Sequence, residues 1–284
     1  MRIAVLAATL IVGVPAKAIE IGALDGAVTQ AELALRARIG VALIDTASGT
    51  VWQRRGGERF PLNSTHKVFS CAAALARADR HEADMDAGIP IDTTTLVAYS
   101  PVTAKVPAGG TMSLRQLCRA AVSFSDNTAA NLVAGAIGGP TAVTAFLRAI
   151  GDGTTRLDRL EPELNQATPG DVRDTTTPLA AAESLQSLLL GDALSRPARA
   201  ELRQWMLNDR VADALLRSGL PKDWRVADKS GAGGHGSRAI IAVAWPSERP
   251  PVVIAIYITQ TDASMAARNH AIAHIGSALA TAFR

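Results

Sequence analysis

Strand-like hydrophobic patterns occupy both ends of the chain. Residues 24–38 have helical spacing, and residues 38–55, RIGVALIDTASGTVWQRR, then predict two strands around an Ala-Ser-Gly turn. Three apolar runs suited to a buried sheet return near the end, before a final helical stretch over about 262–283. These three predicted strands are 224–231, 237–246 and 250–259.

Helical spacing dominates the middle of the chain, which is rich in Ala and Leu and punctuated by Gly and Pro. Since sequential strands usually pair, we expect the three late strands to form an antiparallel meander that the early pair joins. The pattern predicts an α+β fold: a discontinuous sheet domain (19–60 and 208–284), flanked by the first and last helices, with an inserted all-helical domain (61–207). The predicted inner helices are 64–80, 113–122, 127–137, 140–150, 177–190 and 196–206.

One segment of the helical domain follows neither period. Residues 158–175, DRLEPELNQATPGDVRDT, carry two glutamates and two prolines without a sustained apolar repeat. We therefore predict a loop over 156–174. Compact loops of this length are frequently functional, so its charged residues are candidates for the site.

The first residues predict an exported protein. Arg2, the apolar run 3–14 and the small-x-small site Ala16-Lys17-Ala18 follow the plan of a secretory signal peptide, residues 1–18. A membrane anchor is the weaker alternative, because the run is too short to span a bilayer comfortably. Cleavage after Ala18 lowers the formal charge from +3 to +1, and Lys and Arg form no basic run, so nucleic acid is a poor partner.

A serine and a lysine at the start of the first inner helix are the first candidates for chemistry. In PLNSTHKVFSCAAALA, Ser64 and Lys67 are three residues apart and share a helix face with an apolar stripe that continues to Leu75. Burial there should lower the pKa of Lys67, and such a lysine can take the proton of a serine nucleophile. The helix N-terminus would also stabilise an oxyanion. The alternative is a capping Asn63 or Ser64 and a lysine that reaches solvent.

Two further short motifs follow in order. Ser125-Asp126-Asn127 alone is a turn or helix cap, and Lys229-Ser230-Gly231 alone is a strand end before a Gly-rich turn. The order Ser-x-x-Lys, Ser-Asp-Asn, Lys-Ser/Thr-Gly is found in class A β-lactamases and penicillin-binding proteins. Together with YSPVT (99–103), EPELN (161–165), RDTTTP (173–178) and ARNHAIAHIGSAL (267–279), these motifs make the sequence resemble the class A serine β-lactamases over nearly all of the mature chain.

The resemblance implies a β-lactamase/transpeptidase-like fold and a role for each site residue. Ser64 would attack the lactam carbonyl after Lys67, or Glu161 through a water molecule, takes its proton; which of them does so is disputed. Ser125 would pass a proton to the leaving nitrogen, and the backbone N–H groups of Ser64 and Ala232 would form the oxyanion hole. Asp126 would be structural. The residues implied to bind substrate are Tyr99, Asn127, Lys229, Ser230, Gly231, Ala232 and Arg238, with Asn269 near the arginine.

The same resemblance gives the irregular loop a function. Glu161 would activate the water that hydrolyses the acyl-serine, with Asn165 as a second partner of that water. Arg159 and Asp174 would pair across the ends of the loop, and the Glu161–Pro162 bond would be cis, which is cheap only before proline. A carboxylate acting as general base typically adds about 10²–10⁴-fold, whereas penicillin-binding proteins are trapped as slow acyl-enzymes.

The cysteines and histidines leave fewer expectations. In an exported chain Cys71 and Cys118 can pair or remain buried free thiols, and the resemblance implies the disulfide. No cofactor is implied. His66 stands where many relatives carry Phe, and Gly233-Gly234-His235 should make the pocket rim small and flexible. No metal is expected, because zinc-ligand spacing is absent around His66, His81, His235, His270 and His274.

The resemblance thus implies hydrolysis of the β-lactam amide of penicillins first, early cephalosporins next and carbapenems least, giving resistance. We expect a monomer without stable membrane association, exported to the periplasm or, alternatively, secreted. The other functions considered are a penicillin-binding DD-peptidase and a β-lactam sensor domain. Glu161 with Asn165 argues against the first, and the second would need a membrane-spanning signalling region.

Overall fold

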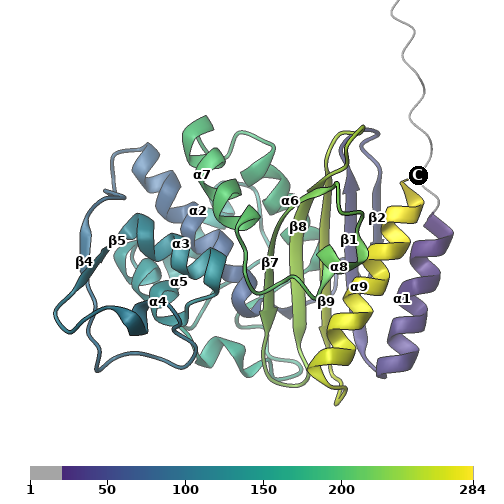
Figure 1. The fold of residues 1–284 in the computed structure, drawn as a ribbon, viewed down its shortest axis with the longest axis horizontal. Coiled ribbons are helices and arrows are strands. Elements are labelled where there is room, and N and C mark those ends of the chain that lie inside the picture. Colours follow the sequence, from purple (N-terminus) through teal and green to yellow (C-terminus); the bar gives the residue numbers. More distant parts are fainter. Residues whose placement is uncertain (1–20, 284) are drawn as a thin grey trace, which may run out of the picture.

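Five antiparallel strands form the central sheet of the computed structural model, which describes residues 21–283 (Figure 1). The predicted signal peptide lies outside the described residues. The strands are β1 (Arg38–Asp45), β2 (Val51–Arg54), β7 (Arg225–Ala232), β8 (Arg238–Trp245) and β9 (Val252–Thr259). Their order across the sheet is β2-β1-β9-β8-β7. The early pair therefore joins the late antiparallel meander, as the sequence predicts.

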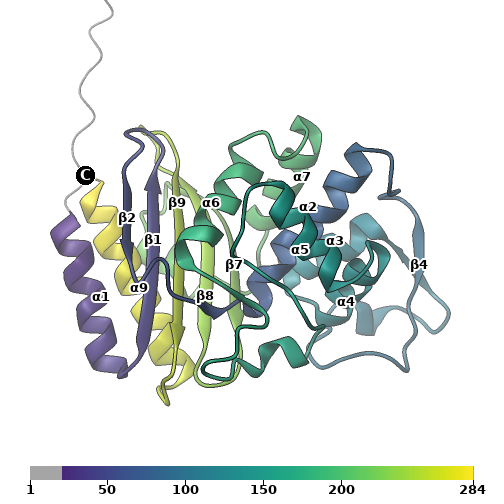
Figure 2. The same cartoon turned by 180° about the vertical axis from the view of Figure 1, so that it is seen from behind.

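Helices cover both faces of this sheet. α1 (Ile21–Leu35) and α9 (Met265–Ala282) pack side by side on one face, where Leu24 and Ile275 are fully buried (Figures 1 and 2). α6 (Pro178–Leu189) packs on the other face. Because β8 and β9 are covered on both sides, their sequences are continuous apolar runs and do not alternate with polar residues.

The segment between the early and late strands forms the helical half of the molecule, beside β7 (Figure 2). Every helix predicted there is present, with ends displaced by at most two residues. The helices besides α6 are α2 (His66–Asp79), α3 (Leu114–Phe124), α4 (Asn127–Ala136), α5 (Pro140–Ala149) and α7 (Arg196–Leu207). α2 lies at the centre, in contact with its neighbours α3, α4, α5 and α7, and residues 66–76 of it are all buried.

Several short elements were not predicted, because two to four residues are too few to show a hydrophobic period. One of them matters for the site: β3 (Phe60–Pro61) pairs with β6 (Thr175–Thr176), which joins the entrance of the helical half to the end of loop 156–174. The other short elements are η1 (Asn63–Thr65), β4 (Gly88–Pro90), η2 (Thr103–Lys105), β5 (Thr111–Ser113), η3 (Glu163–Gln166) and α8 (Leu216–Gly219).

By length and apolar composition, no single described helix could cross a bilayer, and only the bent pair α4 and α5 could do so together.

The predicted cap of the first inner helix is wrong. A 3-10 turn, η1, precedes α2, so Asn63 and Ser64 lie inside this turn and do not cap the helix. Thr65 holds the N-cap position without a side-chain cap, and its hydroxyl donates to the Leu62 carbonyl at 2.6 Å. Ser64 is therefore free of a capping role.

The structure also lacks the disulfide that the resemblance implies. Cys71 on α2 and Cys118 on α3 are buried free thiols. The Cys71 Sγ is directed at the carbonyl oxygen of Cys118, 3.7 Å away, and not into a bond with the partner sulfur. Burial, reinforced by the Cys71 thiol, raises the pKa of Cys118 well above its usual value. The spacing of the two cysteines correctly brings them together, but contact is not a covalent bond.

Candidate active site

The candidate nucleophile lies where the sheet meets the helical half. β7 is an edge strand, and η1 packs against it. A Cβ on Gly231 would lie 2.9 Å from the backbone nitrogen of Ser64 and 2.8 Å from the Cβ of Asn63, so only glycine allows this approach. Ser64, which is 9% exposed, therefore lies beside the last residues of β7, where the strand ends at Ala232.

Lys67 is held in the interior beneath this turn. It is completely buried, and its Nζ donates to the Ser125 carbonyl oxygen at 2.9 Å and to the Asn127 side-chain oxygen. The same nitrogen lies 3.1 Å from Oε1 of Glu161. Burial lowers the pKa of Lys67, although the Glu161 charge opposes that shift. The expectation of a desolvated lysine is confirmed, and the alternative of a lysine that reaches solvent is excluded.

Ser125 connects two buried lysines. It follows α3 in the left-handed conformation, with φ of 58°. Lys229 Nζ donates to its Oγ at 3.1 Å, and Lys67 Nζ lies 3.4 Å from the same oxygen. Burial lowers the pKa of Lys229 to about 8. A hydroxyl between two amines of lowered pKa is suited to pass a proton.

Asp126 and Asn127 fix this segment and the rim beside it. The buried Asp126 carboxylate accepts backbone N–H groups of Val102 at 2.8 Å and Ala129 at 2.8 Å, as expected of a structural residue. Asn127 donates from Nδ2 to the Ala98 carbonyl at 2.8 Å. Since an amide nitrogen carries two N–H groups, one remains for a ligand. Tyr99, predicted to wall the pocket, is 58% exposed at this rim.

Glu161 receives donors on both carboxylate oxygens. Its Oε1 lies 3.1 Å from Lys67 Nζ and 3.3 Å from His66 Nε2, and its Oε2 accepts from Asn165 Nδ2. Burial alone would raise the pKa of Glu161, but the His66 hydrogen bond and the Lys67 charge outweigh it and lower the pKa to about 2. Glu161 is therefore an ionised proton acceptor at neutral pH. The Glu161–Pro162 bond is cis, as predicted.

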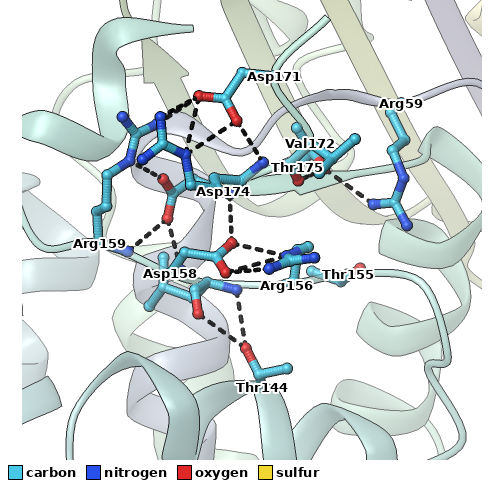
Figure 3. A network of polar contacts seen from close by, with 12 residues as sticks. Arg59, Thr144, Thr155, Arg156, Asp158, Arg159, Asp171, Val172, Asp174 and Thr175 are labelled. Atoms are coloured by element: carbon cyan, nitrogen blue, oxygen red, sulfur yellow. Dashed lines mark hydrogen bonds and ion pairs between the residues drawn. The ribbon is translucent and has the colours of Figure 1, made fainter.

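A buried ion pair closes the loop that carries Glu161 (Figure 3). Arg159 Nε lies 2.6 Å from Oδ2 of Asp174, and Oδ1 of Asp174 accepts the backbone N–H groups of Asp158 and Arg159 at 2.7 and 2.9 Å. The Asp158 carboxylate accepts the Asp174 N–H at 2.9 Å in return. The predicted pair of Arg159 and Asp174 is confirmed, and it fixes the two ends of the loop to each other.

The end of β7 meets a buried arginine on β8. Arg238 is paired in register with Ala232, and its Nη1 donates to the Gly231 carbonyl at 3.0 Å. Its Nε donates to Asn269 Oδ1 at 2.8 Å, so Asn269 lies beside the arginine as the resemblance implies. Burial, and then the charge of Arg268, lower the pKa of Arg238 to about 10. Lys229 and Ser230 on β7 are also buried, and these three side chains are of the types that hydrogen-bond a carboxylate.

The rim after β7 is small because the loop touches it. A Cβ on Gly234 would lie 2.3 Å from the Gln166 carbonyl oxygen. Gly234 N–H donates to the Asn165 carbonyl at 2.8 Å, and Gly233 N–H to Ser237 at 3.2 Å. The first hydrogen bond ties the rim to the loop and the second lies within the rim, so Gly234 serves close approach to the loop.

Two residues of the site were not assigned roles from the sequence. The Asn131 side chain exchanges two hydrogen bonds of 2.8 Å with the backbone of Glu161. Its signal is its position, four residues after Asn127 and so on the same face of α4. His66 contacts the Glu161 carboxylate, and the sequence feature that could have pointed to it is a polar ring in the mostly apolar helix α2, directly before Lys67. Within residues 21–283, no group of three or more His, Cys, Asp or Glu side chains could hold a metal ion.

Comparisons with known proteins agree with this geometry. The model of the β-lactamase enzyme family matches residues 26–283. The chain is 56% identical to β-lactamase AER-1 of Aeromonas hydrophila over 93% of this chain and 87% of that one. It is 48% identical to β-lactamase CARB-3 of Pseudomonas aeruginosa over 87% and 86% of the two chains. An ancestral (GNCA) class A β-lactamase superposes with a TM-score of 0.89 at 50% identity, covering 92% of this chain and 100% of that one. The chromosome-encoded β-lactamase of Vibrio parahaemolyticus gives 0.87 at 48% identity, over 89% and 96%.

Proposed function

The chain belongs to the class A serine β-lactamases, which hydrolyse β-lactams and so give resistance to them. From this premise we propose that it forms an acyl-enzyme on Ser64 and that water activated by Glu161 hydrolyses this acyl-enzyme. The observation that carries the proposal is the position of the Glu161 carboxylate, buried beside Lys67 and Asn165 in the loop next to the nucleophile.

Acylation uses the residues around η1. Ser64 Oγ attacks the lactam carbonyl carbon while its proton passes to Lys67, or through water to Glu161. The oxyanion receives the backbone N–H groups of Ser64 and Ala232, which the contact between η1 and β7 supports. The C–N bond then breaks, and the nitrogen takes a proton from Ser125 Oγ, which in turn takes one from Lys67; Lys229 also donates a hydrogen bond to this oxygen.

Deacylation uses the loop. Water attacks the acyl-serine carbonyl and gives its proton to Glu161, and the ester oxygen leaves as the Ser64 hydroxyl. Asn165, which donates to Glu161 Oε2, is the second partner of that water. The buried pair of Arg159 and Asp174 supports this step indirectly, because it holds the loop in place.

The substrate side of the proposal rests on the charged edge of β7. Lys229, Ser230 and Arg238 bind the β-lactam carboxylate, while Asn127 and the backbone of Ala232 bind the acylamide side chain. Tyr99 forms a wall of the pocket. We propose penicillins as the first substrates and early cephalosporins as the next. The enzyme acts as a monomer, without stable membrane association, and is exported to the periplasm by the signal peptide that residues 1–18 suggest.

The proposal is tested by time courses with benzylpenicillin and a chromogenic cephalosporin on the native enzyme and on Glu161→Gln. The native enzyme should turn over many times, whereas the variant should release one stoichiometric burst and accumulate an acyl-Ser64 adduct, visible by intact-protein mass spectrometry. Sustained turnover by the variant would reject Glu161 as the deacylating base. A single burst from the native enzyme would favour a penicillin-binding or sensor role instead.

A further inference from the structure

A buried histidine contacts the carboxylate that is proposed as the base. His66 lies on α2, two residues after Ser64, and is 2% exposed. Its Nε2 lies 3.3 Å from Glu161 Oε1, and its Nδ1 lies 3.2 Å from Ser70 Oγ, one turn further along the helix. None of the roles proposed above uses this ring.

The two partners determine which ring nitrogen donates. An ionised carboxylate only accepts hydrogen bonds, so Nε2 carries the hydrogen that points at Glu161. Burial lowers the pKa of His66, although the neighbouring Glu161 opposes that shift, so the ring is neutral at pH 7. Nδ1 of a neutral ring of this tautomer accepts, and the Ser70 hydroxyl then donates to it. The ionic groups that act on the ring are Glu161, Lys67 and, more weakly, Asp174.

The contacts divide the two oxygens of Glu161 between two tasks. Oε1 receives donors from Lys67 and His66, whereas Oε2 faces Asn165. Two donors that converge on Oε1 from different residues oppose rotation of the carboxylate. Oε2, beside Asn165, is then the oxygen that remains for the hydrolytic water.

We propose that His66 is a positioning residue for deacylation, whose Nε2–H orients the Glu161 carboxylate and keeps it ionised between turnovers. The inference rests on the proposed role of Glu161 and assigns a partner to it. An apolar ring at this position would leave the buried Oε1 with Lys67 alone. The carboxylate would then be less firmly held and easier to protonate.

The test compares His66→Phe, which keeps a ring but removes the donor, with His66→Gln, which places an N–H donor at similar reach and does not titrate. Acylation and deacylation rates are measured separately by stopped flow with benzylpenicillin, and deacylation is followed after pH jumps that expose the enzyme to acid for only seconds. His274→Phe on the exposed side of α9 is the matched control for the same substitution away from the site.

His66→Phe should deacylate about tenfold more slowly at pH 7, whereas its acylation rate should stay within about threefold of native. In the pH profile of its deacylation rate, the acidic limb should move up by about one pH unit. His66→Gln should restore both values to within about threefold and about 0.3 pH unit. Native deacylation in His66→Phe would overturn the proposal, and so would a His66→Gln variant as impaired as His66→Phe, because ring shape would then be what matters.

A second variant covers the case in which His66→Phe does not fold. Ser70→Ala removes the other partner of the ring and leaves His66 in place, so deacylation should slow by about threefold with the limb displaced in the same direction. An unchanged rate and limb in Ser70→Ala would then overturn the proposal. These outcomes are separate from those of Glu161→Gln: if that variant turns over, the proposed function itself fails, whatever His66 does.

Discussion

The ion pair of Arg159 and Asp174, which closes loop 156–174, can be broken by replacing the arginine. Arg159→Ala leaves the Asp174 carboxylate in place, where its side chain is 0% exposed, and removes the donor at 2.6 Å. The carboxylate keeps two backbone donors, the N–H groups of residues 158 and 159. The same substitution also removes the hydrogen bond of 2.7 Å from Arg159 to Gln166 Oε1 inside the loop.

The magnitude follows from what remains around Asp174. Breaking a buried ion pair from one side costs about 3–5 kcal/mol. Two surviving backbone donors and the 16% exposure of the Arg159 side chain reduce this, so the free energy of unfolding should fall by about 2–3 kcal/mol. The neighbouring Arg156, also drawn in Figure 3, is the matched control. Its pair with Asp158 is between side chains that are 40% and 21% exposed, so Arg156→Ala should cost about 0–1 kcal/mol.

Urea-induced unfolding of the two variants and the native enzyme measures the difference. Because Glu161 follows Arg159 by two residues, Arg159→Ala should also slow deacylation by at least about tenfold while it leaves acylation less affected. Equal losses of stability in Arg159→Ala and Arg156→Ala would refute the reasoning. So would an Arg159→Ala variant that loses stability but deacylates at the native rate, because the loop would then hold Glu161 without the pair.

Three further predictions concern the surroundings of the nucleophile. Gly231→Ala should cost about 1–3 kcal/mol and slow acylation, since the new Cβ would lie 2.9 Å from the Ser64 nitrogen; unfolding and burst rates check this, and a native burst rate contradicts it. Lys229 binds a carboxylate only as an ammonium, so the KM for benzylpenicillin should rise as the pH increases through about 8, and a KM that is flat from about pH 7 to about 9.5 argues against that role. Asp126→Ala should cost about 2–3 kcal/mol in urea unfolding, against about 1 kcal/mol for the exposed cap variant Ser264→Ala; equal costs would show that the hydrogen bonds of Asp126 to the 102–103 segment contribute nothing.

The long elements were predictable because each carries a hydrophobic period over eight or more residues. The runs at β8 and β9 are apolar apart from Arg238 and Thr259 at their ends, and burial on both faces is what such runs indicate. β3 and β6 were not predictable, since two residues such as Phe60 and Pro61 show no period and their pairing depends on where the loop returns. The 3-10 turn before α2 was missed for a similar reason: Asn63 and Ser64 are good caps by type, but contact with β7 places them in a turn.

The candidate site divides in the same way. Motif order identified Ser64, Lys67, Ser125 and Lys229, and these residues do converge, because short motifs at the starts of α2 and α4 and the end of β7 meet at one boundary. The partners of Glu161 were harder to find. Contacts to Asn131 and His66 join a loop to two helices; spacing places each side chain on a helix face, but it does not show that the loop meets that face. The free thiols show the converse, since correct proximity was predicted but not the chemical state.

Burial also bears on which group takes the proton of Ser64. Lys67 and Glu161 are both desolvated: burial lowers the pKa of Lys67 and the Glu161 charge opposes that shift, whereas the His66 hydrogen bond and the Lys67 charge lower the pKa of Glu161. A lysine can act as a base only in its neutral form. In Glu161→Gln the anion that raises the pKa of Lys67 is gone, and the lysine should become neutral more readily. If Lys67 is the base of acylation, the burst of that variant should be as fast as the native burst or faster. If Glu161 acts through water instead, the burst itself should slow by about 10²-fold or more, and pre-steady-state kinetics of this one variant distinguishes the two routes.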